Sequence, residues 1–238
     1  MQRRTKENIK HYLKDAPTLL WVTKNLRRPV GFFISLIYGA CLSLKLTGAW
    51  RFTAIRFSNK LIKVNIKKQR GAKFILHGNL IVESFLEGTS PINIILAEGA
   101  ILEIKNDFVI GQGVTILVYD NAKVLIGGKE NSSASGITAD TKIMAEEKIT
   151  IGKDVIIGWD VVITDSDWHT VAGQKNTAPV IIEDNVWLAH GVSVLKNSVI
   201  GSGSMIAAKG LVSGTIPSNV MAAGIPAKTI KDNFSWSR

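Results

Sequence analysis

The sequence predicts a mostly β solenoid that follows a smaller, partly helical N-terminal region. A helix repeats every 3.6 residues and a strand every two, so a period of six is neither kind of surface element. Such a period is typical of a solenoid, in which each turn adds one rung and the repeated residue fills a continuous core. Aliphatic residues recur at this interval near the C-terminus, at Ile182, Leu188, Val194, Ile200, Ile206 and Val212.

Two further patterns support the solenoid. The same period appears earlier at Ile151, Ile157 and Ile163, and the positions four after each core aliphatic of the later run are small or β-branched. From about residue 73 the chain consists of short aliphatic segments separated by Gly, Asn and Asp, which we interpret as early, less regular coils. The sequence therefore divides into an N-terminal region (1–72), a solenoid (73–231) and a C-terminal tail (232–238).

The N-terminal region differs from the solenoid in charge. The whole chain carries +10, but residues 1–70 hold 16 Lys and Arg against only Glu7 and Asp15, a net charge of +14, and the remainder is about −4. Such a basic segment indicates an anionic partner. No nucleic-acid motif is present, and an apolar run from Val30 to Leu44 lies between basic residues, so an anionic membrane surface is favoured over nucleic acid.

Three elements are expected in this region. Residues 5–15 predict a short polar helix, 29–47 a longer apolar helix that begins at Pro29, and 51–70 an exposed strand. The uncharged run is shorter than the roughly 20 residues that span a bilayer core. It therefore predicts a helix that caps the solenoid, and two alternatives stay open: an interfacial or re-entrant membrane contact, and a true membrane span. The single cysteine, Cys41, excludes an intramolecular disulfide and fits a reducing, cytoplasmic compartment, at the inner membrane face if lipid is bound.

The six-residue frame is interrupted once. Ile163 and Ile182 are 19 residues apart, which is not a multiple of six, so the chain leaves the solenoid after Thr164 and re-enters near Val180. The inserted segment reads DSDWHTVAGQKNTAP. Loops that project from a rigid scaffold often carry function, so this excursion is the candidate site.

The excursion holds Asp165, Asp167 and His169 at alternate positions, which would share one face of an extended backbone. We expect His169 to act as a general base whose tautomer is fixed by a carboxylate or a carbonyl. Two alternatives remain open: an incomplete metal site, and a polar turn without chemistry. His190, in the regular coils, is the second candidate for the base, and no metal is expected.

Residues 182–230 carry a resemblance to a known family. They read IEDNVWLAHGVSVLKNSVIGSGSMIAAKGLVSGTIPSNVMAAGIPAKTI, with an aliphatic–acidic–Asn–Val–Trp start and a closing Gly-x-Pro-Ala-Lys. This stretch resembles the C-terminal block of the left-handed β-helix, hexapeptide-repeat acyltransferases. The Asp-x-Asp-x-His excursion is similar to that of members that O-acetylate sugars of bacterial surface polysaccharides. The sequence departs from the family at Ile225, where Asn is usual, and at Leu188–Ala189, where Ile–Gly is usual.

The resemblance implies a homotrimer that holds acetyl-coenzyme A between neighbouring solenoids. By position, His169 would deprotonate the acceptor hydroxyl, with Asp165 and Asp167 beside it. The indole N–H of Trp187 would donate to the thioester carbonyl, a form of oxyanion stabilisation. The positions that correspond to coenzyme contacts are Trp187, Ala189, Ala207, Ala208, Lys209, Pro226, Ala227 and Lys228.

The function expected from this resemblance is acetyl-coenzyme A-dependent O-acetylation of a sugar hydroxyl, in a bacterial surface polysaccharide or its precursor. Two alternatives stay open. One is N-acylation of a nucleotide-linked amino sugar, which the same base would serve. The other is a solenoid that binds glycan or membrane without catalysis. The acceptor sugar itself follows no transferable code in the sequence.

Overall fold

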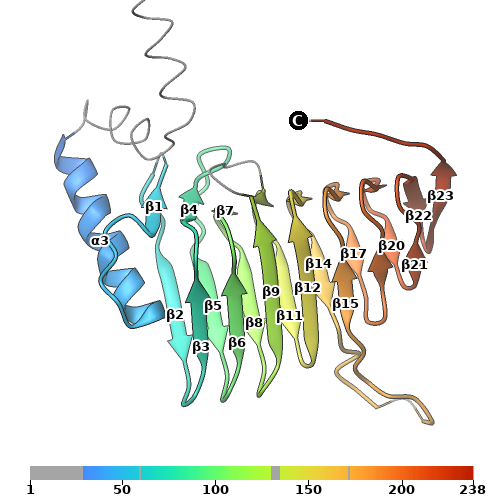
Figure 1. Cartoon of the computed structure of the whole chain (residues 1–238), viewed down its shortest axis with the longest axis horizontal. Helices are drawn as coiled ribbons and strands as arrows, with labels where there is room; N and C mark the ends of the chain where they lie inside the picture. Colours follow the sequence, from blue (N-terminus) through green and yellow to red (C-terminus); the bar gives the residue numbers. More distant parts are fainter. Residues whose placement is uncertain (1–28, 59, 130–134, 171, 238) are drawn as a thin grey trace, which may run out of the picture.

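The chain folds as a solenoid of three long β-sheets with one helix packed on its N-terminal end (Figure 1). The computed structural model describes residues 29–58, 60–129, 135–170 and 172–237. The expected helix at 5–15 lies outside these residues. Successive strands pass from sheet A to sheet B to sheet C and back, so the sheets are the three sides of a prism. The architecture is a left-handed parallel β-helix, which confirms the predicted fold class.

The helix is α3 (Pro29–Thr47). Sheet A contains β1 (Ile55–Phe57), β4 (Leu80–Glu83), β7 (Phe108–Gly111), β10 (Gly136–Ile137), β13 (Ile156–Ile157), β16 (Trp187–Leu188), β19 (Met205–Ile206), β22 (Met221–Gly224) and β23 (Ala227–Lys231). Sheet B contains β2 (Val64–Lys68), β5 (Ile92–Leu96), β8 (Thr115–Val118), β11 (Lys142–Ala145), β14 (Val162–Thr164), β17 (Ser193–Val194) and β20 (Leu211–Val212). Sheet C contains β3 (Lys73–Leu76), β6 (Ile101–Ile104), β9 (Lys123–Gly128), β12 (Lys148–Lys153), β15 (Val180–Ile182), β18 (Val199–Ile200) and β21 (Thr215–Ile216). All neighbours in the three sheets pair in parallel except β22 and β23, which are antiparallel.

The six-residue frame is confirmed as the core of the solenoid. All six aliphatics of the later run are at most 1% exposed, and those of the earlier run are equally buried. They stack in register between coils, for example Ile157 beside Leu188 and Leu188 beside Ile206. Each coil therefore adds one aliphatic layer to a continuous apolar interior.

The corners of the later coils explain why the frame has this composition. A left-handed backbone conformation recurs every six residues, at Asn185, Gly191, Asn197, Gly203 and Lys209, with φ between 55° and 74°. Gly and Asn tolerate positive φ better than other residues do, so they mark the points at which the chain turns. Lys209 is the one residue in this series of five that is neither Gly nor Asn.

α3 caps the first coil, as the helix prediction for 29–47 anticipated. Leu42 and Leu46 join the solenoid core, and Gly39 lies so close to the carbonyl oxygen of Ile55 that a Cβ would collide with it. The segment 51–70 was expected to be an exposed strand. Instead it forms β1 and β2 of the first coil, with Phe57 buried, because α3 covers its apolar side.

Candidate active site

The excursion from the six-residue frame has the predicted boundaries. β14 ends at Thr164 and β15 begins at Val180, and the chain between them projects from the edge where sheets B and C meet (Figure 1). The two legs of the loop pair through an antiparallel bridge between Ser166 and Thr177. The base of the loop is therefore an ordered part of the scaffold.

Asp165 fixes the start of this loop. Its side chain is fully buried, and its carboxylate oxygens accept hydrogen bonds from the backbone N–H groups of Glu146, Glu147 and Lys148 at 2.7, 2.9 and 2.6 Å. Burial raises the pKa of the Asp165 carboxyl, and these N–H groups oppose the shift by stabilising the carboxylate. Asp165 thus holds the loop to the preceding corner, between β11 and β12, and fits a positioning role.

Replacing Asp165 with Ala should destabilise the protein. The change leaves three partly buried N–H groups without their acceptor, and each costs about 1 kcal/mol or more, so we expect the free energy of unfolding to fall by about 3 kcal/mol. Urea unfolding at a fixed protein concentration measures it. The matched control is Asp167→Ala, which removes a half-exposed ion pair and should cost only about 0–1 kcal/mol. Equal losses in the two variants would contradict the anchoring role of Asp165.

Asp167 and His169 lie farther along the loop and are exposed. Asp167 forms an ion pair with Lys196, with Oδ2 and Nζ 2.6 Å apart. Trp168 adopts φ of +63°, so the backbone is not extended and the three side chains do not share one face as expected. The ring of Trp168 packs on Tyr119, with centroids 5.0 Å apart. His169 follows it, and among the described residues its imidazole has no hydrogen-bond partner.

The metal alternative receives no support from this geometry. Asp165 faces the solenoid corner, whereas Asp167 faces Lys196. No group of three or more His, Cys, Asp or Glu side chains gathers to hold a metal ion among the described residues.

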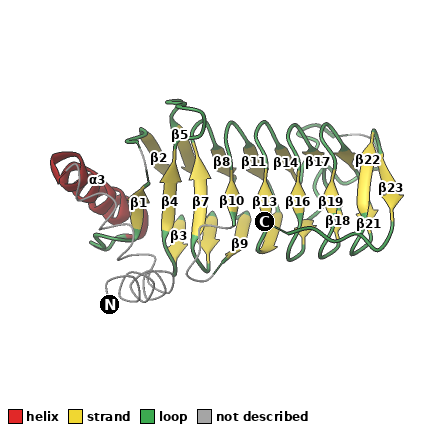
Figure 2. Cartoon of the chain, turned by 90° about the horizontal axis from the view of Figure 1, so that it is seen from above, coloured by secondary structure: helices red, strands yellow, loops and turns green. Residues whose placement is uncertain are grey.

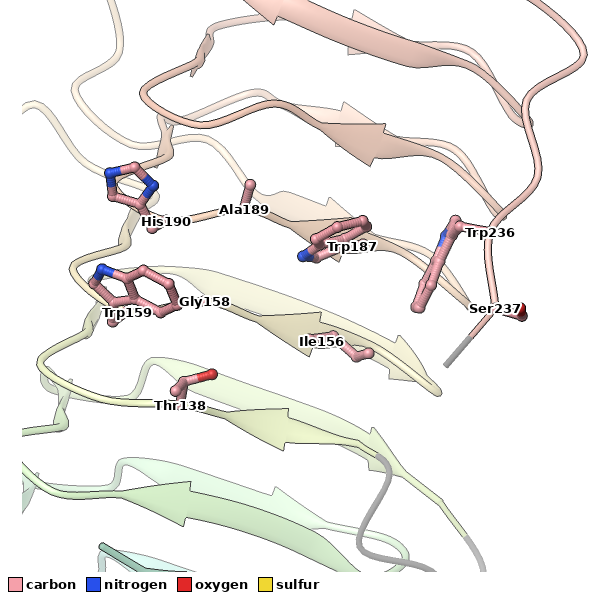
Figure 3. A pocket seen from close by; sticks show the side chains of 9 residues that line it. All are labelled: Thr138, Ile156, Gly158, Trp159, Trp187, Ala189, His190, Trp236 and Ser237. Atoms are coloured by element: carbon pink, nitrogen blue, oxygen red, sulfur yellow. The ribbon is translucent and has the colours of Figure 1, made fainter. Parts of the chain in front are cut away.

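A second feature is an aromatic pocket of about 420 Å³ on the outer face of sheet A (Figure 3). Trp159 and His190 stack at one end with centroids 5.3 Å apart and an interplanar angle of 21°. Trp187 and Trp236 form the other end, with centroids 5.8 Å apart. Figure 3 shows the indole nitrogen of Trp187 on the side that faces Trp159 and His190. The pocket is thus mostly apolar, and its polar groups include the indole N–H of Trp187 and the imidazole of His190.

Trp236 belongs to the tail, to which the sequence assigned no role. The tail returns along sheet A (Figure 2), and the indole N–H of Trp236 donates to the carbonyl oxygen of Asn185 at 3.1 Å. Sequence reasoning missed both Trp236 and Trp159. Two aromatic residues, Phe234 and Trp236, in a short tail are a signal that could have indicated the first of them.

The residues assigned to coenzyme contact follow one edge of the prism, between sheets A and B. β16, β19 and β22 are consecutive in sheet A, with Leu188 beside Ile206 and Ile206 beside Ala222. This register places Ala189 beside Ala207, and Ala208 beside Gly224 of the last turn. Pro226, Ala227 and Lys228 continue from that turn into β23, where Pro226 and Lys228 are exposed. The small alanines leave the edge open to a ligand.

Lys209 lies on the same edge, beside His190. Its backbone N–H donates to the carbonyl oxygen of His190 at 3.0 Å, and its Nζ is 3.4 Å from Oδ2 of Asp160, with both side chains exposed. Its φ is +61°, at a corner where the neighbouring coils have Gly191 and Asp160, both also with positive φ. An exposed cation on this edge suits an anionic ligand.

The loop and the pocket lie on opposite sides of one chain. The loop leaves the edge between sheets B and C, whereas the pocket opens on sheet A (Figures 1 and 2). A single copy therefore does not bring His169 to Trp187. A site that contains both residues needs the loop of one copy and the sheet A of another.

The chain shares short stretches of sequence with curated acetyltransferases. No protein-family model matches it. The chain is 44% identical over 55 residues to an Escherichia coli K12 protein named for lipopolysaccharide biosynthesis O-acetyl transfer, WbbJ, covering 23% of this chain and 28% of that protein. It is 37% identical over 60 residues to the galactoside O-acetyltransferase of the same organism, covering 25% and 30%.

Among solved structures, the polysialic-acid-specific acetyltransferase NeuO shares 23% identity with a TM-score of 0.48, and the match covers 78% of this chain and 89% of NeuO. The chain matches less than a third of the length of the curated relatives above. It is similar to the hexapeptide-repeat acetyltransferases, and within them to sugar O-acetyltransferases, as its motifs predicted.

Proposed function

We propose that the protein transfers an acetyl group from acetyl-coenzyme A to a hydroxyl of a sugar in a bacterial surface polysaccharide or its precursor. The observation that carries the proposal is the pairing of two features on one solenoid. One is a loop that Asp165 holds at its base and whose His169 imidazole has no hydrogen-bond partner among the described residues. The other is an apolar pocket that continues into an edge of small residues and exposed lysines.

The donor fits the edge between sheets A and B. Ala189, Ala207 and Ala208 leave room for the extended pantetheine arm, and Lys209 and Lys228 supply positive charge for its phosphates. Pro226 and Ala227 offer an apolar surface to the adenine. The aromatic pocket, at one end of this edge, would take the acetyl thioester beside Trp187.

The acceptor step needs a base and a donor to the developing oxyanion. His169 takes the proton of the sugar hydroxyl, and the hydroxyl oxygen attacks the thioester carbonyl carbon. The indole N–H of Trp187 donates to the carbonyl oxygen as it gains negative charge. The carbon–sulfur bond then breaks, and the proton held by His169 goes to the departing thiolate, so that the products are the ester and free coenzyme A.

This chemistry requires an oligomer, because the loop and the pocket face away from each other in one chain. A cyclic assembly with parallel solenoid axes would place the edge between sheets B and C of each copy against sheet A of the next. A homotrimer closes that ring, as the resemblance implies. Each of its sites would take His169 from one copy and Trp187 from another.

The experiment is to incubate the purified protein with acetyl-coenzyme A and a panel of oligosaccharides, and to follow thiol release and the mass of the acceptor. We expect stoichiometric thiol release and a mass gain of one acetyl group on a hydroxylated sugar. Treatment of the product with mild base distinguishes the alternatives, since it removes an O-acetyl ester and leaves an N-acetyl amide. Thiol release that depends on an amino sugar, with a base-stable product, would favour N-acylation. No acetylated product with any acceptor would favour the binding-protein alternative.

A further inference from the structure

The outer face of α3 remains apolar although the helix is already packed on the solenoid. Its inner face packs on the first coil through Leu42 and Leu46, which belong to the solenoid core. The opposite side exposes an apolar stripe, which consists of Val30, Phe33, Ile34, Ile37, Cys41 and Leu44. Phe33 and Ile37 are 60% and 59% exposed. Trp50 and Phe52 follow the helix and are also exposed, with their rings 6.1 Å apart.

A basic recess of about 490 Å³ lies beside this stripe, between α3 and the first strands of sheet B. Its lining includes Lys45 of the helix, together with Lys63 and Lys67, and contains no carboxylate among the described residues. None of these lysines forms an ion pair within the described part of the chain. Asn65 and Asn93 line the same recess and are hydrogen-bonded to each other at 2.9 Å. The recess is therefore polar and positively charged.

The contacts of α3 decide how it can meet a membrane. The helix is long and apolar enough to cross a bilayer, but only by length and composition. Lys68 Nζ donates to the carbonyl oxygen of Leu46 at 2.8 Å, and the hydroxyl of Tyr38 accepts from the backbone N–H of Val64 at 3.0 Å. A crossing helix would break these contacts or take the lysine-rich first coil into hydrocarbon, where charges are costly. α3 can instead lie flat, with its exposed stripe in the interface.

We propose that this end of the solenoid docks on an anionic bilayer. The apolar stripe enters the boundary between headgroups and acyl chains, Trp50 and Phe52 lie at the same depth, and the lysine recess receives an anionic headgroup. The charge complementarity is strong, since residues 1–70 carry +14 while the rest of the chain is slightly acidic. α3 lies across the end of the prism (Figure 1), so docking would leave the excursion and the aromatic pocket, both in later coils, free of the membrane.

The test uses the full-length protein and vesicles of phosphatidylcholine, alone or mixed with phosphatidylglycerol. We expect sedimentation with the mixed vesicles at low salt, weaker binding at high salt, and little binding to phosphatidylcholine alone. The double variant Lys63→Gln/Lys67→Gln should lower the partition coefficient about 25-fold, because each surface-proximal lysine contributes about fivefold. Phe33→Asp/Ile37→Asp should lower it by more than tenfold, because both side chains leave the interface.

Two controls match these variants. Lys231→Gln removes an exposed lysine of β23, eight strand positions from β1 and thus about 38 Å away, beyond the Debye length even at low salt, and should bind as wild type. Ile230→Asp adds a charge at an exposed isoleucine, 61% accessible, at the other end of the solenoid. Circular dichroism and light scattering establish that every variant keeps its fold and its oligomeric state.

Three results would overturn the proposal. Wild-type vesicle binding by both Phe33→Asp/Ile37→Asp and Lys63→Gln/Lys67→Gln would assign membrane attraction to residues 1–28 alone. A changed oligomeric state in Phe33→Asp/Ile37→Asp, with no wild-type binding to vesicles, would make the stripe a contact between copies. Equal binding to neutral and anionic vesicles would show that the lysines do not attract the protein to an anionic membrane. The vesicle assay needs no acetyl transfer, so its result tests membrane docking independently of the proposed activity.

Discussion

His169→Ala should reduce acetyl transfer by about 10²–10⁴-fold, the usual loss when a general base is removed. The imidazole is exposed on a loop whose base is held by Asp165 and by the bridge between Ser166 and Thr177. The substitution therefore removes the proposed base, and we expect it to leave the fold of the loop intact. Steady-state rates with saturating acetyl-coenzyme A measure the loss, and coenzyme binding by calorimetry should stay within a few-fold of wild type.

His190→Ala is the matched control for this prediction. His190 lies in the aromatic pocket and stacks on Trp159, so its loss should weaken binding more than it slows the chemical step. The expected pattern is a fall in kcat for His169→Ala and a rise in KM for His190→Ala. Activity within a few-fold of wild type in His169→Ala, together with a large fall in kcat for His190→Ala, would transfer the role of base to His190.

Ile200→Asp should prevent folding. Ile200 is fully buried on β18, beside Ile182 and Ile216 of the neighbouring coils, and a carboxylate there would have no partner in the apolar core. An unpaired buried charge costs more than about 4–5 kcal/mol, a large part of a typical stability. Expression as insoluble protein, or loss of the cooperative thermal transition in circular dichroism, would report the effect.

The control for this variant is Ile181→Asp. Ile181 lies on the adjacent strand of the same sheet and is the same residue type, but its side chain is 40% exposed and points away from the core. Ile181→Asp should fold, with a loss below about 1 kcal/mol. A soluble Ile200→Asp variant with an unchanged melting temperature would contradict the six-residue frame.

The local patterns of the sequence predicted the scaffold well. The period of six identified the core because each coil repeats one geometry, so that burial recurs at fixed intervals along the chain. The helix at 29–47 began at a proline and ended as expected, and the excursion had the predicted limits. The sequence did not predict that the first coil starts at Ile55, because the apolar residues there become buried only through contact with α3.

The arrangement of the site could be predicted only in part. The motif predicted Trp187 and the alanines as site residues, and this stays a prediction. The contact between Trp236 and Asn185 joins residues 51 positions apart and leaves no local pattern. The roles of Asp165 and Asp167 could not be separated either. A spacing of two suggests a shared face, and only the positive φ of Trp168 and the three N–H groups around Asp165 show that the two carboxylates diverge.

The central claim is that His169 and Trp187 act together from different copies of the chain. Co-expression of His169→Ala with Trp187→Ala, followed by purification of the mixed oligomer through two different tags, tests it directly. Each variant alone should have lost at least about 100-fold in activity, the usual effect of removing a general base or an oxyanion donor. In a mixed trimer that carries both tags, one of the three sites would take both intact residues, so we expect about a third of wild-type activity. Mixed oligomers no more active than the two parents, although correctly assembled, would contradict a site shared between copies.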